Sequence, residues 1–367
     1  THKGEALLVA NDYRRFNYTP YAYRTKDYGK TWTRIVDGND VESYVLSIVE
    51  DKENPNLLFL GTDDGLYISF NAGGKWQKWT EGFPTVSTKD LVIHPREQDL
   101  VIGTFGRAAW VLDDIRPLRA LAQNPSILQK EVSLFESPDA YLAAYQQATG
   151  SRFGGDAIYN GDNRKQGAML TYYLKEGKEH ESKSDKKEDE EEKADETKKD
   201  EKPKKDSIFI KIYDGDRLIR TLSHKTPKKA GFHRVYWGLD EKGPDTPARK
   251  ISKSKRENGG ISVKPGTYNV KIQYGDHSDS TRVIVKTDPR IKTSFEGIQE
   301  VYDMGKRLED YTQTAADAVK QLVQNKNLAQ KFEKEMKELD KEKYKDQIKA
   351  SRDIVKKIDS VVALYLG

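Results

Sequence analysis

An eight-residue pattern that occurs twice, at residues 25–32 and 69–76, constrains the fold of this chain more than any other sequence feature. Each copy has a hydroxyl residue first, Asp or Asn third, Gly fifth and Trp eighth. Asp and Asn bond the backbone of tight turns, and Gly accommodates a positive φ. The spacing predicts a compact hairpin with an indole folded over it, and it gives structural roles to Thr25, Asp27, Gly29, Trp32, Ser69, Asn71, Gly73 and Trp76.

A longer repeat surrounds these turns. Residues 48–62 match residues 91–104 at an offset of about 42 residues, and both copies end in Gly-Thr. A period of about 40 to 45 residues with four short strands is typical of β-propeller blades. The repeat predicts three strands of one blade at 6–11, 21–25 and 32–36, a whole blade at 44–79, and a third blade at 89–112 without its outer strand.

Such blades do not close on themselves. Propellers have about 4 to 8 blades, and a single blade cannot bury both of its faces. We therefore expect residues 1–115 to be the last blades of a propeller whose remaining blades come from a preceding segment or from another chain. The start at Thr1, without Met or a signal-peptide pattern, leads to the same expectation of a processed or excised piece of a longer protein.

The eight-residue pattern resembles the Asp-box of sialidase-type and sortilin-type propellers. Asp-Tyr-Gly-Lys-Thr-Trp-Thr at 27–33, Gly-Thr-Asp-Asp-Gly-Leu-Tyr-Ile-Ser at 61–69 and Gly-Thr-Phe-Gly-Arg-Ala-Ala-Trp-Val-Leu-Asp-Asp-Ile at 103–115 resemble the end of a large bacterial sortilin-like propeller. Members of this family are often labelled glycosyl hydrolase or BNR-repeat proteins, and the resemblance extends over nearly the whole chain. Relatives usually carry His where this chain has Phe105, so a His-dependent site is not expected there.

Periodicity divides the rest of the chain. Residues 116–130 predict a connector helix, and residues 131–290 alternate with period two between turn signals such as those at 214–216 and 265–266. About seven strands in this arrangement predict an immunoglobulin-like or fibronectin-like β-sandwich, which the resemblance also implies. Within it, residues 175–206 are an almost unbroken tract of Lys, Glu and Asp, which predicts a disordered solvated spacer; an interaction tail is the alternative.

Residues 291–367 have helical spacing. Thr293 and Glu296 form a capping box, and a second apolar run extends from Tyr344 to Tyr365. We predict an antiparallel hairpin around a shorter helix at 328–339, either packed on itself or with a stripe that docks on a partner. The first helix is predicted to place these residues on one face: Phe295, Ile298, Tyr302, Gly305, Leu308, Thr312, Ala316, Val319 and Val323.

The predicted fold is therefore mainly β, with a partial Asp-box β-propeller of about three blades, an immunoglobulin/fibronectin-like sandwich and a C-terminal α-helical hairpin. Composition excludes several functions. Basic and acidic residues nearly balance, 63 against 59, so nucleic acid is not expected as a partner, and no run approaches the roughly 18 apolar residues of a membrane span. With no cysteine, the chain has no disulfide, catalytic thiol or Cys-type zinc site.

Candidate chemistry is sparse. A glycosidase needs two carboxylates about 5 to 10 Å apart, or a tyrosine nucleophile with an acid and an arginine cluster. Asp63-Asp64 and Asp113-Asp114 are adjacent in sequence and flank turns, so we predict no catalytic residue among them. Arg107, beside the Gly106 turn, is the best candidate for binding an anion. The six histidines lack metal-ligand spacing, so we expect neither a metal nor a cofactor.

Three functions follow as hypotheses. The resemblance implies an extracytoplasmic location, periplasmic, at the cell surface or secreted, and a propeller-based binding or scaffold protein that recognises protein, peptide or glycan. The alternative is a glycan hydrolase of the sialidase type whose active site lies mostly in the remaining blades. A third hypothesis, from resemblance to propeller factors that assist photosystem assembly, is a role in assembling a membrane complex.

Overall fold

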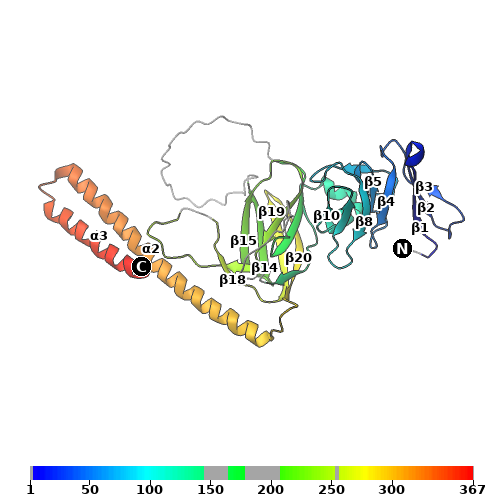
Figure 1. Cartoon of the computed structure of the whole chain (residues 1–367). Helices are drawn as coiled ribbons and strands as arrows, with labels where there is room; N and C mark the ends of the chain where they lie inside the picture. The colour runs from blue at the N-terminus through cyan, green and yellow to red at the C-terminus, as the bar shows by residue number, and fades with distance from the viewer. Residues whose placement is uncertain (1–2, 144–163, 178–206, 253–255, 367) are drawn as a thin grey trace.

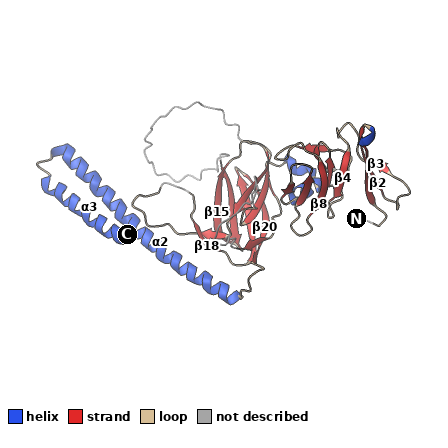
Figure 2. Cartoon of the chain, viewed as in Figure 1, coloured by secondary structure: helices blue, strands red, loops and turns tan. Residues whose placement is uncertain are grey.

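The computed structural model describes residues 3–143, 164–177, 207–252 and 256–366. Three small β-sheets, a β-sandwich and a long helical hairpin follow one another along the chain (Figure 1, Figure 2). The prediction of a mainly β fold followed by a helical hairpin is confirmed. The spacer predicted at 175–206 lies almost wholly outside the described residues, and the domain boundaries at 115, 130 and 290 stay predictions.

The three N-terminal sheets contain the strands that the 42-residue repeat predicts. The first consists of β1 (Ala6–Asp12), β2 (Asn17–Thr25) and β3 (Thr33–Arg34), with a short 3-10 helix, η1 (Tyr13–Arg15), between β1 and β2. The second consists of β4 (Val45–Glu50), β5 (Leu58–Thr62), β6 (Gly65–Ser69) and β7 (Gln77–Trp79). The third consists of β8 (Thr88–Ile93), β9 (Leu100–Thr104) and β10 (Ala109–Leu112). All neighbouring strands in these sheets are antiparallel.

The middle sheet is buried on both faces because apolar residues continue through β5 and β6 without polar alternation. Leu58, Leu60 and Tyr67 pack toward the first sheet. On the opposite face, Phe59 and Ile68 pack toward the third sheet, in a cluster that also includes Leu118 and Ala122 of α1 (Arg116–Gln123). The predicted connector helix is thus α1 followed by a 3-10 helix, η2 (Pro125–Gln129), and α1 closes the core beneath the third sheet.

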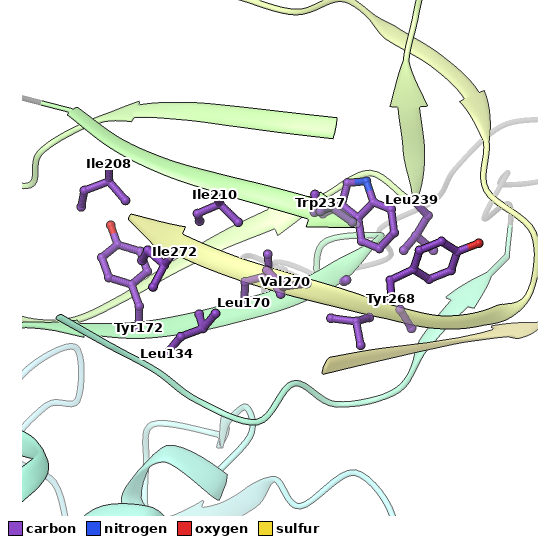
Figure 3. Packing of buried hydrophobic residues seen from close by; sticks show 14 of the residues in the cluster. Leu134, Leu170, Tyr172, Ile208, Ile210, Trp237, Leu239, Tyr268, Val270 and Ile272 are labelled. Atoms are coloured by element: carbon purple, nitrogen blue, oxygen red, sulfur yellow. The ribbon is translucent and has the colours of Figure 1, made fainter. Parts of the chain in front are cut away.

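The sandwich consists of two sheets around one apolar core. One sheet has the order β11 (Val132–Leu134), β13 (Ala168–Leu174), β16 (Gly231–Trp237). The other has the order β12 (Ala140–Leu142), β20 (His277–Thr287), β19 (Gly266–Tyr274), β14 (Ser207–Asp214), β15 (Arg217–Lys225), and only β12 and β20 pair in parallel. Figure 3 shows Trp237, Leu239 and Tyr268 at one end of this core and Ile208, Tyr172 and Ile272 at the other. The rings of Trp237 and Tyr268 pack edge to face, with centroids 5.3 Å apart.

Two helices complete the chain. α2 (Phe295–Asp340) is one continuous helix of 46 residues, and α3 (Lys345–Leu366) folds back along its C-terminal part. The separate short helix predicted at 328–339 is wrong, because α2 has no Gly or Pro after Gly305 to interrupt it. The predicted cap is also displaced by one residue: the hydroxyl of Ser294, not Thr293, accepts a hydrogen bond from the Gly297 backbone N–H, 3.1 Å away.

The single apolar face predicted for α2 is wrong as well. Val319 and Val323 are buried against Ile358 and Val362 of α3, whereas Phe295 and Leu308 are 65% and 58% exposed. The reason is that α2, with 46 residues, is much longer than α3, with 22 residues. Its N-terminal part meets the sandwich and its C-terminal part meets α3, so two different faces are covered along one helix.

Glu241 anchors α2 to the sandwich. This buried carboxylate, in β17 (Asp240–Lys242), accepts hydrogen bonds from Arg217 (2.8 Å), from the Tyr302 hydroxyl (2.7 Å) and from Lys306 (2.8 Å). Burial alone would raise the pKa of Glu241, but these three donors together lower it to about 2. Beside this network, the Glu309 carboxylate accepts from the backbone N–H of Ile261 in β18 (Gly259–Ser262).

Candidate binding site

The two hairpins that resemble Asp-boxes, which we call the Asp-box hairpins, share a set of hydrogen bonds. In the first, the Thr25 hydroxyl donates to Asp27 (2.8 Å) and accepts from the Gly29 N–H (2.9 Å), while Asp27 accepts from the Thr31 N–H and hydroxyl. In the second, the Ser69 hydroxyl donates to Asn71 (3.0 Å) and accepts from the Gly73 N–H (3.0 Å). The glycines have φ of 83° and 92°, a region that favours Gly.

The two indoles of these hairpins differ in their surroundings. Trp76 is 4% exposed and donates to the Ile35 carbonyl 2.8 Å away, so it packs on the neighbouring first sheet. Trp32 is 41% exposed and donates to the Gly29 carbonyl in its own turn. Within the described part of the chain, no sheet lies beside the first sheet on that side. Of the two indoles, only that of Trp76 is therefore buried.

A second set of turns lies at the opposite end of the same strands. Gly65 pairs with Thr62 at one end of β5 and β6, and Ser69 pairs with Leu58 at the other, where the Asp-box begins. The β1–β2, β5–β6 and β9–β10 turns all lie at the end of the sheets where Gly65 pairs with Thr62. Hydrogen bonds hold the chain at this end: Asn11 donates to the Val45 carbonyl, and the Phe105 N–H donates to the Ser87 carbonyl. We call residues 13–18, 44, 63–65, 89 and 104–108 the turn rim.

The turn rim exposes an unusual set of aromatic side chains. Phe16 is 83% exposed, Phe105 74%, Tyr18 53% and Tyr13 38%. Tyr13 stacks on the buried ring of Tyr44, with centroids 4.8 Å apart and planes at 17°. Phe16 has φ of 62°, a region that non-Gly residues seldom occupy, and this conformation turns the chain at its exposed tip. Exposed aromatic groups of this kind mark interaction sites more often than isolated surface residues do.

Cationic side chains accompany these rings. The guanidinium of Arg14 lies 6.0 Å from the Tyr13 ring, and the Lys89 ammonium lies 5.6 Å from the Phe105 ring. Arg107 is exposed, and its backbone carbonyl accepts from the Trp110 indole. Among residues 3–143, 164–177, 207–252 and 256–366, none forms an ion pair with the Arg107 guanidinium. The rim therefore offers positive charge next to flat apolar surfaces.

The carboxylate pairs have partners within the fold. Asp64 forms an ion pair with Lys78, and Asp63 accepts from the Tyr44 hydroxyl. Burial, with the Asp63 hydrogen bond, raises the pKa of Tyr44 to about 12. Asp114 is buried and pairs with Arg116 at 2.7 Å, while the Asp113 carbonyl accepts from Arg234 of the sandwich. These contacts explain both pairs as parts of the turns and of the junction with the sandwich.

The structure places the predicted residues at two separate ends of the sheets. The Asp-box residues lie at one end and Arg107 at the other, beside aromatic residues that the sequence analysis did not single out. No group of three or more His, Asp or Glu side chains is positioned to hold a metal ion, as far as the described residues extend. None of the helices in this part of the chain is both long enough and apolar enough to cross a membrane.

Comparison with known proteins identifies one family-level similarity. Residues 21–116, from β2 to the first residue of α1, match the family model Sortilin-Vps10, described as sortilin, neurotensin receptor 3. This segment is similar to that family, and the match does not extend to the sandwich or the helical hairpin. Neither this family description nor the structural neighbour described below mentions a glycosyl hydrolase.

A similar solved structure is the extracellular domain of BT4673 from B. thetaiotaomicron, with 11% sequence identity and a TM-score of 0.20. The alignment covers 79% of this chain and 30% of that structure, so the chain spans less than a third of its length. No curated protein matches the chain.

Proposed function

We propose that this chain is part of an extracytoplasmic propeller-type binding or scaffold protein, and that its turn rim contacts a protein, peptide or glycan segment that carries negative charge. The exposed rings of Phe16, Tyr18 and Phe105 carry this proposal together with the exposed Arg107, which forms no ion pair with any described residue. Rigid aromatic side chains supply contact area at a low entropic cost, and the cations attract and orient an anionic group. The Sortilin-Vps10 match, whose description names a receptor, supports the same reading.

Binding explains the site better than hydrolysis does. A glycan hydrolase needs an acid and a second carboxylate facing one sugar unit, or a tyrosine nucleophile with its acid. Asp64 and Asp114 are instead held in ion pairs with Lys78 and Arg116. A binding surface does not need a free carboxylate, so the proposed function is compatible with the ion pairs of Asp64 and Asp114.

The outer sheets support a second part of the proposal, that further blades pack on this chain. The first sheet exposes Leu8 (43%) and Trp32 (41%), and the third sheet exposes Val92 (53%) and Val111 (55%) on the face away from the core. The middle sheet, by contrast, is covered on both faces. Open apolar faces at both ends of a row of blades are what additional blades would cover.

The test begins by measuring binding of the purified full chain to arrays of acidic peptides and acidic glycans. The strongest hit is then titrated against Phe105→Ala and Arg107→Ala. We expect each substitution to weaken binding at least about fivefold, in line with 1 kcal/mol or more per contact of a binding hot spot. Tyr28→Ala is the matched control, because Tyr28 is 77% exposed at the Asp-box end.

Three outcomes would contradict the proposal. Unchanged affinity in both rim variants would remove the site, and equal weakening by Tyr28→Ala would make the effect non-specific. Turnover of a bound glycan by the purified chain would favour the hydrolase alternative. Mass spectrometry of proteins that co-purify with the intact protein separates a soluble ligand from a membrane complex, which is the third hypothesis.

A further inference from the structure

A second apolar stripe runs along α2, on a face that adjoins the face that packs on α3. It repeats with alternating steps of three and four residues from 301 to 339. We call it the outer seam, and it consists of Val301, Met304, Leu308, Tyr311, Ala315, Ala318, Leu322, Asn325, Ala329, Phe332, Met336 and Leu339. A heptad pattern sustained over more than five heptads, with one polar member, is typical of a coiled-coil interface.

Most of the large residues of the outer seam are exposed. Val301 is 75% exposed, Tyr311 64% and Leu308 58%, and near the other end Leu339 is 75% and Phe332 50% exposed. Figure 1 shows that α3 lies along only the C-terminal part of α2, so no helix among the described residues covers the N-terminal part of the seam. Such an apolar stripe on an exposed helix is costly in water unless something packs on it.

We propose that the outer seam pairs with the outer seam of a second copy of this chain in an antiparallel helix pair. The seam alternates between the heptad positions a and d. In an antiparallel coiled coil, a residue at position a of one helix faces a residue at position d of the other helix. The register that aligns the whole stripe sets Val301 against Leu339 of the partner subunit and Leu308 against Phe332 of the partner subunit. The most exposed residues of one half thereby meet the most exposed residues of the other half.

Side-chain size supports this register. It sets Tyr311 against the small Ala329 of the partner subunit, and Leu322 against the small Ala318 of the partner subunit. A core fills best when large residues face small ones. A parallel pair would instead set Tyr311 on Tyr311 and Ala329 on Ala329, which crowds one layer and leaves a void in another.

Charge also favours the antiparallel pair. Beside the seam, Arg307 comes to lie near Glu335 of the partner subunit, and the pair occurs twice by symmetry. Both side chains are on the surface, and the Lys331 contact of Glu335 is a long one, 3.8 Å. In a parallel pair Glu335 would lie near Asp340 of the partner subunit, a repulsive arrangement. These charges therefore favour the antiparallel orientation of the two α2 helices over the parallel one.

The seam continues an interface that already exists. Leu322 packs against the cluster of Val319, Val323, Ile358 and Val362 between α2 and α3, and Ala329 of the seam is also buried. The α2 helix of a second copy would therefore extend the apolar core that α2 and α3 already form. Asn325, the polar member, faces Ala315 of the partner subunit, and a single polar residue in a seam commonly fixes register.

Cysteine crosslinking of the full chain tests orientation, because the natural chain has no cysteine. Gln321 lies beside the twofold axis of the antiparallel pair, so Gln321→Cys should give a covalent dimer with a short bismaleimide. Leu308→Cys should not, since the two copies of residue 308 would lie about 36 Å apart along the helices. The reverse pattern, or no dimer with either variant, would overturn the proposal.

Sedimentation equilibrium tests the energetics. The full chain should approach twice its 41.9 kDa with rising concentration. Leu308→Glu or Phe332→Glu should weaken dimerisation at least tenfold. Phe295→Glu, on α2 but off the seam, is the control and should have no effect. Arg307→Glu should weaken the dimer, and adding Glu335→Arg should restore it. A monomer at every concentration, or a dimer indifferent to Leu308→Glu with helicity retained, would contradict the pairing.

Discussion

The indole N–H of Trp76 donates to the backbone carbonyl of Ile35, 2.8 Å away, and this bond joins the hairpin of the second sheet to the first sheet. The equivalent indole, Trp32, donates to Gly29 within its own hairpin. One sequence motif thus has two structural environments, and the neighbouring sheet decides between them. The stability of the blades should depend on this difference.

Trp76→Ala should destabilise the blades by about 3 to 5 kcal/mol, because it removes a fully buried indole and leaves a cavity between two sheets. Trp32→Ala should cost no more than about 1 to 2 kcal/mol, because nearly half of its surface is already in water. Urea unfolding of the full chain, followed by far-UV circular dichroism, measures both. Equal shifts of the first transition would contradict the packing described.

Asp27→Asn should keep the hairpin intact, since Asn71 of the second hairpin accepts the equivalent hydrogen bonds from the Ser69 hydroxyl and the Lys75 N–H. Hydrogen bonds from Thr31 lower the pKa of Asp27 to about 2. The stability that its ionised form contributes should be present above the unfolded-state pKa of about 3.9 and lost as pH falls through about 2. Thermal unfolding between pH 7 and pH 2 should show this acid sensitivity in the natural chain and not in Asp27→Asn. Asp27→Ala should lower the midpoint at every pH.

Glu241→Ala should release the N-terminal part of α2 from the sandwich. It would leave Arg217 and Lys306 without their shared carboxylate, at a cost of about 2 kcal/mol, below the about 3 to 5 kcal/mol of a fully buried pair because Arg217 is half exposed. Hydrogen exchange of residues 295–312 should become faster while residues 345–366 keep their protection. Unchanged exchange at 295–312 would mean that Glu241 does not hold the helix.

The same contact should weaken in acid. The pKa of Glu241 is lowered to about 2 from its ordinary value of 4.5. Its contribution to stability is therefore complete above pH 4.5 and is lost as the pH falls through about 2. Exchange at residues 295–312 should rise in that window, and Glu241→Gln should remove the dependence.

Residues 1–115 expressed alone should be insoluble or lack a cooperative transition. The fragment has open apolar faces on both outer sheets, and it lacks Leu118 and Ala122, which belong to the core between the second and third sheets. A fragment of residues 1–130 should be better ordered, because it contains Leu118 and Ala122, although its outer apolar faces stay open. Calorimetry of both fragments tests this, and a sharp transition for residues 1–115 would show that the blades need no partner.

The fold was predictable where the pattern was local and repeated. The 42-residue repeat located the strands around Gly61 and Gly103, and two-residue alternation located those of the sandwich. The helices were harder because their faces depend on what lies beside them. Leu308 fits the apolar face that the sequence predicts, yet it is exposed, since the sandwich covers the side of α2 that carries Tyr302.

The turn rim was only partly predictable. Arg107 was found because it follows a glycine turn, but Phe16 and Phe105 are ordinary apolar residues in sequence and join one surface only when the sheets stack. The sequence does contain one signal for them: Phe16 lies in the turn between β1 and β2, and Phe105 lies in the equivalent turn between β9 and β10. Comparing equivalent turns across repeats would have grouped them.

Hydrogen–deuterium exchange of the full chain, with and without the peptide or glycan found by the binding arrays, tests the central claim most directly. The rim predicts slower exchange at residues 13–18, 63–65 and 104–108 and no change at the Asp-box hairpins, residues 25–32 and 69–76. Protection confined to the Asp-box hairpins, or to the sandwich, would contradict the turn rim as the binding surface.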